Sequence, residues 1–262
     1  RLISVFYAGY DHVYIPNGAL PNGGRICYAV SSDNGFTWST SKTLLDSPQD
    51  DRDSSITQLA DGRLAMNFFK SPSGNVFVTY SSDFGKTWTP ESQVMTSYAT
   101  SSPIREIAPG HLILPMYRSV GRSTNNGASW QFTEIPSATP GVLGHGVTET
   151  DVVKLTNGNL YAIHRADNGN PMQFTTSTNN GVNWGTTLPL SFQGHAPYLL
   201  PLNSGTILLA YRDPVDATTK MRVSTDQAAT WSAPTVVDTV EGAYASMRQM
   251  PDGSVFITYY EE

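Results

Sequence analysis

The sequence predicts an all-β fold built from repeated four-stranded antiparallel sheets, and three observations support this prediction. An octapeptide that ends in tryptophan occurs five times in the 262 residues. Two apolar segments joined by a short turn precede most of these copies. No stretch of useful length shows the 3.6-residue periodicity of an amphipathic helix. Repeats of about 40 to 54 residues with this content are typical of a β-propeller.

Every tryptophan of the chain ends one copy of the octapeptide. Asp or Asn at its third position can accept hydrogen bonds from backbone N–H groups further on, and Gly at its fifth position favours a left-handed turn. We therefore interpret the octapeptide as a turn whose indole packs between sheets. A calcium-binding role is disfavoured because two copies carry Asn. The copies are SSDNGFTW from Ser31, SSDFGKTW from Ser81, STNNGASW from Ser123, STNNGVNW from Ser177 and STDQAATW from Ser224, the last without the glycine.

The paired apolar segments predict the two inner strands of each sheet. Examples are ITQLADGRLAMNFF, VVKLTNGNLYAIH and MRQMPDGSVFITYY. Asp-Gly or Asn-Gly between two apolar runs is the strongest short-range signal of a β-hairpin. A third strand then leads into the octapeptide and a fourth strand follows it. Because one such sheet cannot bury both of its faces, we expect the sheets to stack around an axis.

Six repeat units can be counted along the chain, at about 1–45, 52–95, 103–135, 149–190, 196–237 and 243–262. The first unit lacks its inner strand, because Arg1-Leu2 aligns with Arg63-Leu64, and the last unit stops after its second strand. We therefore predict that residues 1–262 form a single domain, a six-bladed β-propeller with incomplete first and last blades. The alternative is a five-bladed ring in which the last strands close the first sheet.

The composition excludes several classes of protein. Sixteen basic and twenty-two acidic residues give a net charge of −6, which argues against a nucleic-acid-binding protein. A lone cysteine, Cys27, excludes an intramolecular disulfide framework. Apolar runs such as 206–211 are far shorter than the roughly 20 residues that span a membrane. No metal-ligand spacing stands out and no cofactor is expected, the low charge favours a secreted or periplasmic protein, and the oligomeric state is left open.

Ionisable residues recur at two positions of the repeat that converge on the axis of a propeller. Equivalent positions of neighbouring blades come together there, so we expect three arginines to point at one pocket. Their planar guanidinium groups match a carboxylate; the alternative is ion pairing at the blade rims. The ionisable residues at these positions are Lys70, Arg118, Arg165, Arg212 and Glu261 after the second strand, and Arg52, Asp53, Glu149, Asp151, His195 and Tyr244 before the inner strand. His145, His164 and His195 are either polar residues of the pocket or structural histidines.

The octapeptide pattern S/T-x-D-x-G-x-T/S-W is similar to the Asp-box, and the chain resembles the sialidase (neuraminidase) superfamily of Asp-box (BNR) repeat propellers. The resemblance covers the whole chain and implies a sialidase-like six-bladed fold. Asp-boxes also occur in other glycosidases, in lyases and in propellers without enzymatic activity. The resemblance therefore specifies the fold more closely than the function.

The resemblance implies an arginine triad that holds the carboxylate of the substrate, a Tyr–Glu nucleophilic pair and an aspartate that acts as acid and base. Glu149 lies sixteen residues before Arg165 and looks like the glutamate that assists the nucleophile. Tyr244, ahead of an Asp-Gly turn, looks like the nucleophile itself. Arg165 and Arg212 look like the second and third arginines, although Arg212 comes earlier in its blade than the family pattern places it.

Other implied roles are less complete. Glu261 lies where the family has a glutamate that braces the first arginine. Asp11 is the only aspartate in the first-blade loop and is taken as the acid/base. The first arginine of the family lies upstream of the first blade, at a position that would precede Arg1. No arginine stands just before the fifth octapeptide, where the residues are Thr218, Thr219 and Lys220.

The resemblance thus implies an exo-acting, retaining glycoside hydrolase for a terminal, anionic, sialic-acid-like sugar on a carbohydrate or glycoconjugate. Two alternatives stay open. One is another carbohydrate-active propeller enzyme, of the uronate lyase or rhamnosidase type, that uses His145, His195 or Tyr244 as acid or base. The other is a propeller that binds carbohydrate without catalysis.

Overall fold

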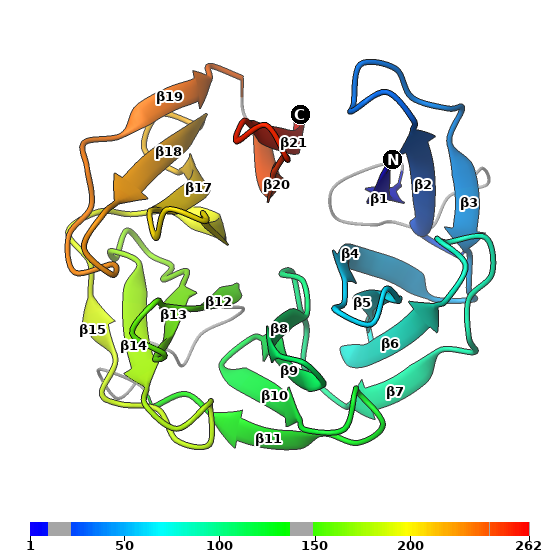
Figure 1. Cartoon of the computed structure of the whole chain (residues 1–262), viewed down its shortest axis with the longest axis horizontal. Helices are drawn as coiled ribbons and strands as arrows, with labels where there is room; N and C mark the ends of the chain where they lie inside the picture. The colour runs from blue at the N-terminus through cyan, green and yellow to red at the C-terminus, as the bar shows by residue number, and fades with distance from the viewer. Residues whose placement is uncertain (10–21, 137–148, 241, 262) are drawn as a thin grey trace. The chain divides into compact units, whose positions relative to one another are not determined.

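The computed structural model describes residues 1–9, 22–136, 149–240 and 242–261. Asp11 and His145 lie outside the described residues. The chain forms two compact units, Arg1–Gly110 and His111–Glu262. Every regular element of the described residues is a β-strand (Figure 1), as the missing helical periodicity predicts. Within the described ranges, no helix could span a membrane.

Unit 1 contains the strands β1 to β8, drawn from blue to green in Figure 1. The first three form a three-stranded antiparallel sheet in chain order, and the next four form a four-stranded sheet in chain order. The bounds of these strands are β1 (Leu2–Ala8), β2 (Arg25–Ser31), β3 (Lys42–Leu45), β4 (Asp50–Gln58), β5 (Leu64–Ser71), β6 (Asn75–Ser81), β7 (Ser92–Met95) and β8 (Arg105–Ala108).

Unit 2 contains the strands β9 to β21. The strands β9 to β11 pair in chain order, two four-stranded sheets follow with the orders β12-β13-β14-β15 and β16-β17-β18-β19, and β20 pairs with β21. The first bounds are β9 (His111–Met116), β10 (Ser119–Ser123), β11 (Gln131–Glu134), β12 (Thr150–Lys154), β13 (Leu160–His164), β14 (Gln173–Ser177) and β15 (Leu188–Pro189). The others are β16 (His195–Pro201), β17 (Ile207–Asp213), β18 (Thr218–Ser224), β19 (Thr235–Asp238), β20 (Gly242–Gln249) and β21 (Val255–Glu261).

The position of the Asp-box confirms the predicted meander and decides the number of blades. Each box joins the last two strands of its sheet. Its first serine pairs with the first or second residue of the strand before, as Ser177 does with Leu160 and Ser224 with Ile207. Five boxes mark five blades, which confirms the five-bladed alternative. The preferred count of six was wrong, because β20 and β21 form only a two-stranded pair without a box.

The Asp-box is a turn closed by its own side chains. In the first copy, Ser31 Oγ donates to Asp33 Oδ1 (2.7 Å) and accepts from the Gly35 N–H (2.8 Å). The N–H and the hydroxyl of Thr37 donate to the two oxygens of the same carboxylate, at 2.9 and 2.6 Å. Asn125 makes the same connections in the third copy, with Oδ1 and Nδ2 both bonded to Ser129. The partners of the carboxylate are N–H and O–H donors, which supports the turn interpretation.

The core lies between the faces of neighbouring sheets within each unit. In unit 2, side chains of β12 and β13 pack against side chains of β16 and β17, and Trp231 packs on the same cluster. Its indole lies 6.4 Å from the ring of Tyr161, between centroids. In unit 1, Ile26 of β2 packs against Met66 and Phe68 of β5. Full burial of one such side chain stabilises the fold by about 1.5–3 kcal/mol.

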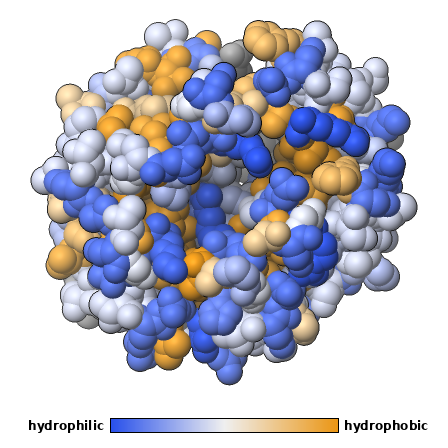
Figure 2. Space-filling model, viewed as in Figure 1, coloured by the Kyte–Doolittle hydropathy of each residue, from blue (hydrophilic) through white to orange (hydrophobic). Residues whose placement is uncertain are grey.

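The surface mixes polar and apolar residues. On the face shown in Figure 2, hydrophilic residues predominate and apolar residues are scattered among them. The most exposed large apolar side chains are Phe36 (88%), Val215 (76%) and Phe84 (60%). Phe36 and Phe84 belong to Asp-box turns, so the exposed aromatic residues follow from the turn geometry at these boxes.

Candidate functional site

Five strand ends of unit 2 bring ionisable residues together. Glu149 immediately precedes β12, and its carbonyl accepts a hydrogen bond from the Arg165 N–H at 2.9 Å just after β13. His195 opens β16 and pairs with Arg212 of β17. Tyr244 lies near the start of β20. These are the strand ends that the repeat predicts to carry chemistry, and all of them belong to one unit.

The carboxylate of Glu149 is the centre of this cluster. Glu149 is buried, with 1% of its surface exposed. Its Oε1 accepts hydrogen bonds from the Tyr244 hydroxyl (2.7 Å) and from Arg165 Nη1 (3.1 Å). Its Oε2 accepts from the backbone N–H of Ala196 at 2.6 Å. The two residues that the family resemblance pairs as nucleophile and assisting base are therefore in direct contact, although they are 95 positions apart.

Two β-bulges place the donors around Glu149. The strand register shifts between Ala243 and Ser246 and between His195 and Tyr198. At these bulges, Tyr244 has φ 53° and Ala196 has φ 48°, in the left-handed region that is rare for a bulky side chain. A bulge re-aims a side chain and often lies next to an active site. Here the bulges direct a phenol and a backbone N–H to the same carboxylate.

The same device occurs in unit 1. The register shifts between Arg52 and Ser55, and Asp53 has φ 49°. Bulges therefore recur near the start of β4, β16 and β20, whereas β12 pairs with β13 without a shift of register. Strained backbone that recurs at strand ends is a reason to look for function there.

Arg165 is held by carboxylates on two sides. Its Nε donates to Asp167 Oδ1 at 2.8 Å, and its Nη1 donates to Glu149. Burial lowers the pKa of Arg165, but the charges of Glu149 and Asp167 outweigh it, so that the pKa is raised overall. The guanidinium therefore stays charged and fixed in direction. Asp167 was not predicted from the sequence, although it stands only two residues after Arg165.

His195 lies within the electrostatic field of the same groups. Burial, followed by the positive charges of Arg165 and Arg212, lowers its pKa, while Glu149 and Asp167 oppose this shift. The imidazole is therefore neutral at pH 7, where one ring nitrogen donates and the other accepts a hydrogen bond. A neutral imidazole of this kind can bond to a sugar hydroxyl.

The strand register separates Arg118 from the other two arginines. Arg165 and Arg212 each stand five positions after the residue that pairs with the serine of the box, but Arg118 stands six positions after it. Arg118 lies in the turn between β9 and β10 with φ 60°, and its side chain is exposed. Arg118 is therefore not at the same register position as Arg165 and Arg212, because it lies in the turn beyond the end of β9. Its contact with a substrate stays a prediction.

The other predicted site residues have separate surroundings. Arg52 and Asp53 lie in unit 1, where Arg52 Nε is 3.8 Å from Asp50 Oδ2 and 4.0 Å from Asp53 Oδ1. The Arg52 guanidinium also lies 5.5 Å from the centre of the Tyr7 ring. Burial and the charge of Asp50 raise the pKa of Tyr7 to about 12. Glu261 pairs with Gly242 through the backbone of β21 and β20.

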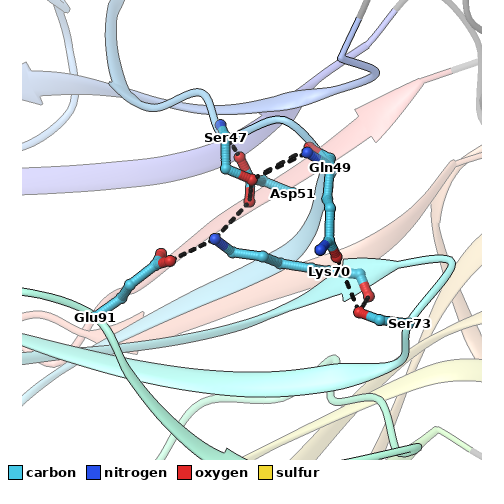
Figure 3. Close-up of polar contacts among 6 residues, drawn as sticks. All are labelled: Ser47, Gln49, Asp51, Lys70, Ser73 and Glu91. Carbon is cyan, nitrogen blue, oxygen red and sulfur yellow. Dashed lines mark hydrogen bonds and ion pairs between the residues drawn. The ribbon is translucent and has the colours of Figure 1, made fainter.

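Lys70, the residue before the last of β5, is buried and belongs to a polar network of unit 1 (Figure 3). Its Nζ donates to Glu91 and lies 3.8 Å from Asp51 Oδ1. Asp51 also accepts hydrogen bonds from the N–H and the hydroxyl of Ser47, at 2.7 and 2.9 Å. Ser73 donates to Gln49 Oε1 at 2.9 Å and to the Lys70 carbonyl at 3.0 Å. These contacts tie β5 to the segments before β4 and β7, so we assign Lys70 a structural role.

No group of three His, Cys, Asp or Glu residues that could hold a metal ion occurs in the described part of the chain. Residues 114–261 match the family model of the BNR repeat-like domain. This match covers more than half of the chain. The chain belongs to the BNR repeat-like domain family. No curated protein sequence matches this BNR repeat-like chain.

Several solved structures are similar to the BNR repeat-like chain. The NanB sialidase from Streptococcus pneumoniae has a TM-score of 0.81 at 12% identity, over 99% of this chain and 63% of that one. The intramolecular trans-sialidase from Ruminococcus gnavus has a TM-score of 0.73 at 13% identity, over 91% of this chain and 83% of that one. The leech intramolecular trans-sialidase has a TM-score of 0.73 at 14% identity, over 91% of this chain and 60% of that one. The chain spans less than two thirds of the leech and pneumococcal chains. The likeness confirms the sialidase-like propeller fold.

Proposed function

We propose that the chain is a glycoside hydrolase of the sialidase superfamily that removes a terminal, anionic, sialic-acid-like sugar with retention of configuration. The observation that carries the proposal is the hydrogen bond of 2.7 Å from the Tyr244 hydroxyl to Glu149 Oε1. The similar structures support it, because they are sialidases, and the leech enzyme is complexed with 2,7-anhydro-Neu5Ac.

The proposed chemistry begins at Tyr244. A free phenol has a pKa near 10 and needs a base within hydrogen-bond reach to act as a nucleophile at neutral pH. Glu149 takes the phenolic proton as the Tyr244 oxygen attacks the anomeric carbon, and the bond to the leaving oxygen breaks. Most retaining glycosidases use a carboxylate nucleophile, and sialidases are the exception. A neutral phenol avoids the repulsion between a carboxylate nucleophile and the carboxylate of the substrate.

The remaining steps need an acid, a base and a cationic clamp. Asp11, assigned from the family resemblance, protonates the leaving oxygen and then activates the water that cleaves the glycosyl–tyrosine bond. Arg165 and Arg212 bind the substrate carboxylate, since a planar guanidinium matches it. His195 bonds to a sugar hydroxyl. Arg52, Asp53 and Glu261 remain predicted substrate contacts, and a secreted or periplasmic location remains a proposal from composition.

The test is turnover of a fluorogenic sialoside by the wild type, Tyr244→Phe, Glu149→Gln and Tyr198→Phe. Loss of the nucleophile or of its base is expected to lower kcat by about 10²–10⁴-fold. Tyr198→Phe is the matched control, because its hydroxyl donates to the Met247 carbonyl (3.2 Å) and not to Glu149. It should retain kcat within about twofold of the wild type.

Three outcomes would contradict the proposal. Wild-type kcat in Tyr244→Phe would exclude the tyrosine nucleophile. Glycan binding without turnover by the wild type would support a non-catalytic carbohydrate-binding propeller. Release of an unsaturated uronate, detected by its ultraviolet absorbance, would support a lyase.

A further inference from the structure

The surroundings of Arg165 restrict how its guanidinium can approach a ligand. Asp167 Oδ1 accepts from Nε at 2.8 Å, and Glu149 Oε1 accepts from Nη1 at 3.1 Å. Within the described residues, two of the five N–H donors of the group are thus engaged, and three remain, including both on Nη2. The side chains of Arg165 and Asp167 are 21% and 26% exposed, so that a ligand can reach this edge.

The direction of the Arg165 guanidinium also affects the hydrogen bond between Tyr244 and Glu149. Its Oε1 accepts from both Arg165 and Tyr244, so the two donors share one oxygen. A guanidinium that was free to rotate could form the bidentate pair with Glu149 that arginine favours, and would then compete with the phenol. The bond from Nε to Asp167 opposes this rotation.

We propose that Asp167 is a positioning residue that fixes Arg165 so that the Nη2 edge faces the carboxylate of an anionic sugar. This inference rests on the proposed function, because it concerns how the same site selects its substrate. Asp167 adds a negative charge near an anionic ligand, so electrostatic attraction to the ligand does not explain the role of Asp167. Its contribution lies in the direction that it gives to Arg165.

The experiment compares the binding of a sialic acid glycal and of its methyl ester by calorimetry. The wild type is expected to bind the acid at least tenfold more tightly than the ester. Asp167→Ala should lower the affinity for the acid about tenfold and leave that for the ester within about twofold. Asp167→Asn keeps an acceptor oxygen for Nε and should keep the preference for the acid.

Asp61→Ala is a matched control. Arg63 Nε donates to Asp61 Oδ2 at 2.8 Å, so this pair has the same spacing of two residues and the same length as the pair of Arg165 and Asp167. It lies in the turn between β4 and β5 of unit 1. Asp61→Ala should leave the preference for the acid unchanged, which separates the loss of any exposed ion pair from the loss of this one.

The outcomes are distinguishable. A wild type that prefers the acid, with Asp167→Ala unchanged in that preference, overturns the inference alone. Equal loss for the acid and the ester also overturns it, because that indicates a general structural role. Loss of the preference in Asp167→Asn as in Asp167→Ala overturns it too, and this variant decides the case if Asp167→Ala does not fold. A wild type that binds neither compound and turns over no sialoside overturns the proposed function together with the inference.

Discussion

At the scale of single residues, His164 is an unusual component of the core. His164 stands four residues after the residue that pairs with the first serine of its Asp-box. The equivalent residues of β5, β9 and β17 are Phe68, Met116 and Tyr211. His164 is 1% exposed, and its Nδ1 lies 2.9 Å from Thr150 Oγ1. Its Nε2 is buried without a hydrogen-bond partner among the described residues. Burial lowers its pKa to about 3, so the folded protein holds a neutral imidazole directly before Arg165.

We expect His164 to make the fold sensitive to acid. Because its folded pKa of about 3 lies below the ordinary value of 6.5, the unfolded chain binds more protons between these pH values. The contribution of neutral His164 is therefore complete above about pH 6.5 and is lost as the pH falls toward 3. His164→Met, which copies the residue of β9, should reduce the decrease in the free energy of unfolding between pH 7 and 4.5. Urea denaturation measures this, with His111→Gln as the control, and an unchanged decrease would contradict it.

At the scale of elements, three of the Asp-box turns contain an aspartate whose carboxyl pKa is lowered by hydrogen bonds. The side-chain hydrogen bond from Thr37 and the backbone hydrogen bond from the same residue lower the pKa of Asp33 to about 2. The equivalent bonds from Thr87 lower the pKa of Asp83 to about 2, and Thr230 lowers that of Asp226. The two copies that carry Asn125 and Asn179 form the same turn with a neutral amide in place of the carboxylate.

We predict that the Asp-boxes contribute to acid unfolding below pH 4. A depressed folded pKa gives a contribution that is present above the unfolded value of about 3.9 and is lost as the pH falls toward about 2. Asp33→Asn combined with Asp83→Asn should make the loss of stability between pH 4 and 2 shallower, because Asn does not titrate. Circular dichroism at a series of pH values measures the transition. Asp46→Asn, outside the boxes, should leave the slope as in the wild type; an equal change there would contradict the prediction.

The network around Lys70 is the corresponding feature of the four-stranded sheet in unit 1. The side chain of Lys70 is 8% exposed and that of Asp51 is fully buried. The ammonium group also lies 4.7 Å from the centre of the Phe77 ring. Removal of one partner from a buried ion pair leaves the other charge without compensation, which costs about 3–5 kcal/mol.

Lys70→Met is therefore expected to lower the free energy of unfolding by about 3 kcal/mol. Methionine keeps most of the volume of the aliphatic stem. Lys220→Met is the control, because Lys220 also binds two carboxylates, but one of them, Asp216, is 48% exposed. We expect that variant to lose about 1 kcal/mol or less in chemical denaturation. Equal losses in the two variants would show that burial does not matter at these sites.

At the scale of the whole molecule, the repeat predicts that changes in different blades act independently. Gly62 and Gly158 occupy the same hairpin turn in two sheets, with φ of +88° and +91°. A Cβ at either position would meet no atom within 4 Å. The cost of alanine there is therefore backbone strain alone, about 1–2 kcal/mol for each residue.

We expect the double variant Gly62→Ala/Gly158→Ala to lose the sum of the two single losses within about 0.5 kcal/mol. Gly185→Ala serves as the control, because the φ of Gly185 is outside the left-handed region and its added Cβ would lie 3.5 Å from the nearest atom. That variant should change stability by about 0.5 kcal/mol or less. Thermal or chemical denaturation of the four proteins tests the sum, and a large deviation from it would contradict independent blades.

The sequence by itself determined the features that form within a few residues. The Asp-box closes through bonds between positions two and four apart, such as Ser31 with Asp33 and Gly35. The hairpin turns depend on one glycine each. Such short-range chemistry can be recognised from residue types, and so the strands, their order and the meander were predictable. The pair of Glu149 and Tyr244 came from the family resemblance, because nothing local connects residues 95 positions apart.

Only the tertiary structure decided what depends on register and on contacts between strands. A difference of one residue removed Arg118 from the row of Arg165 and Arg212, and the two-stranded pair β20–β21 left five blades instead of six. Bulges turned Tyr244 and the Ala196 N–H toward Glu149, and Asp167 folded back onto Arg165. The repeat marks where each blade begins, but a bulge or a shift of one position leaves no mark in a sequence and reverses the face on which a side chain lies.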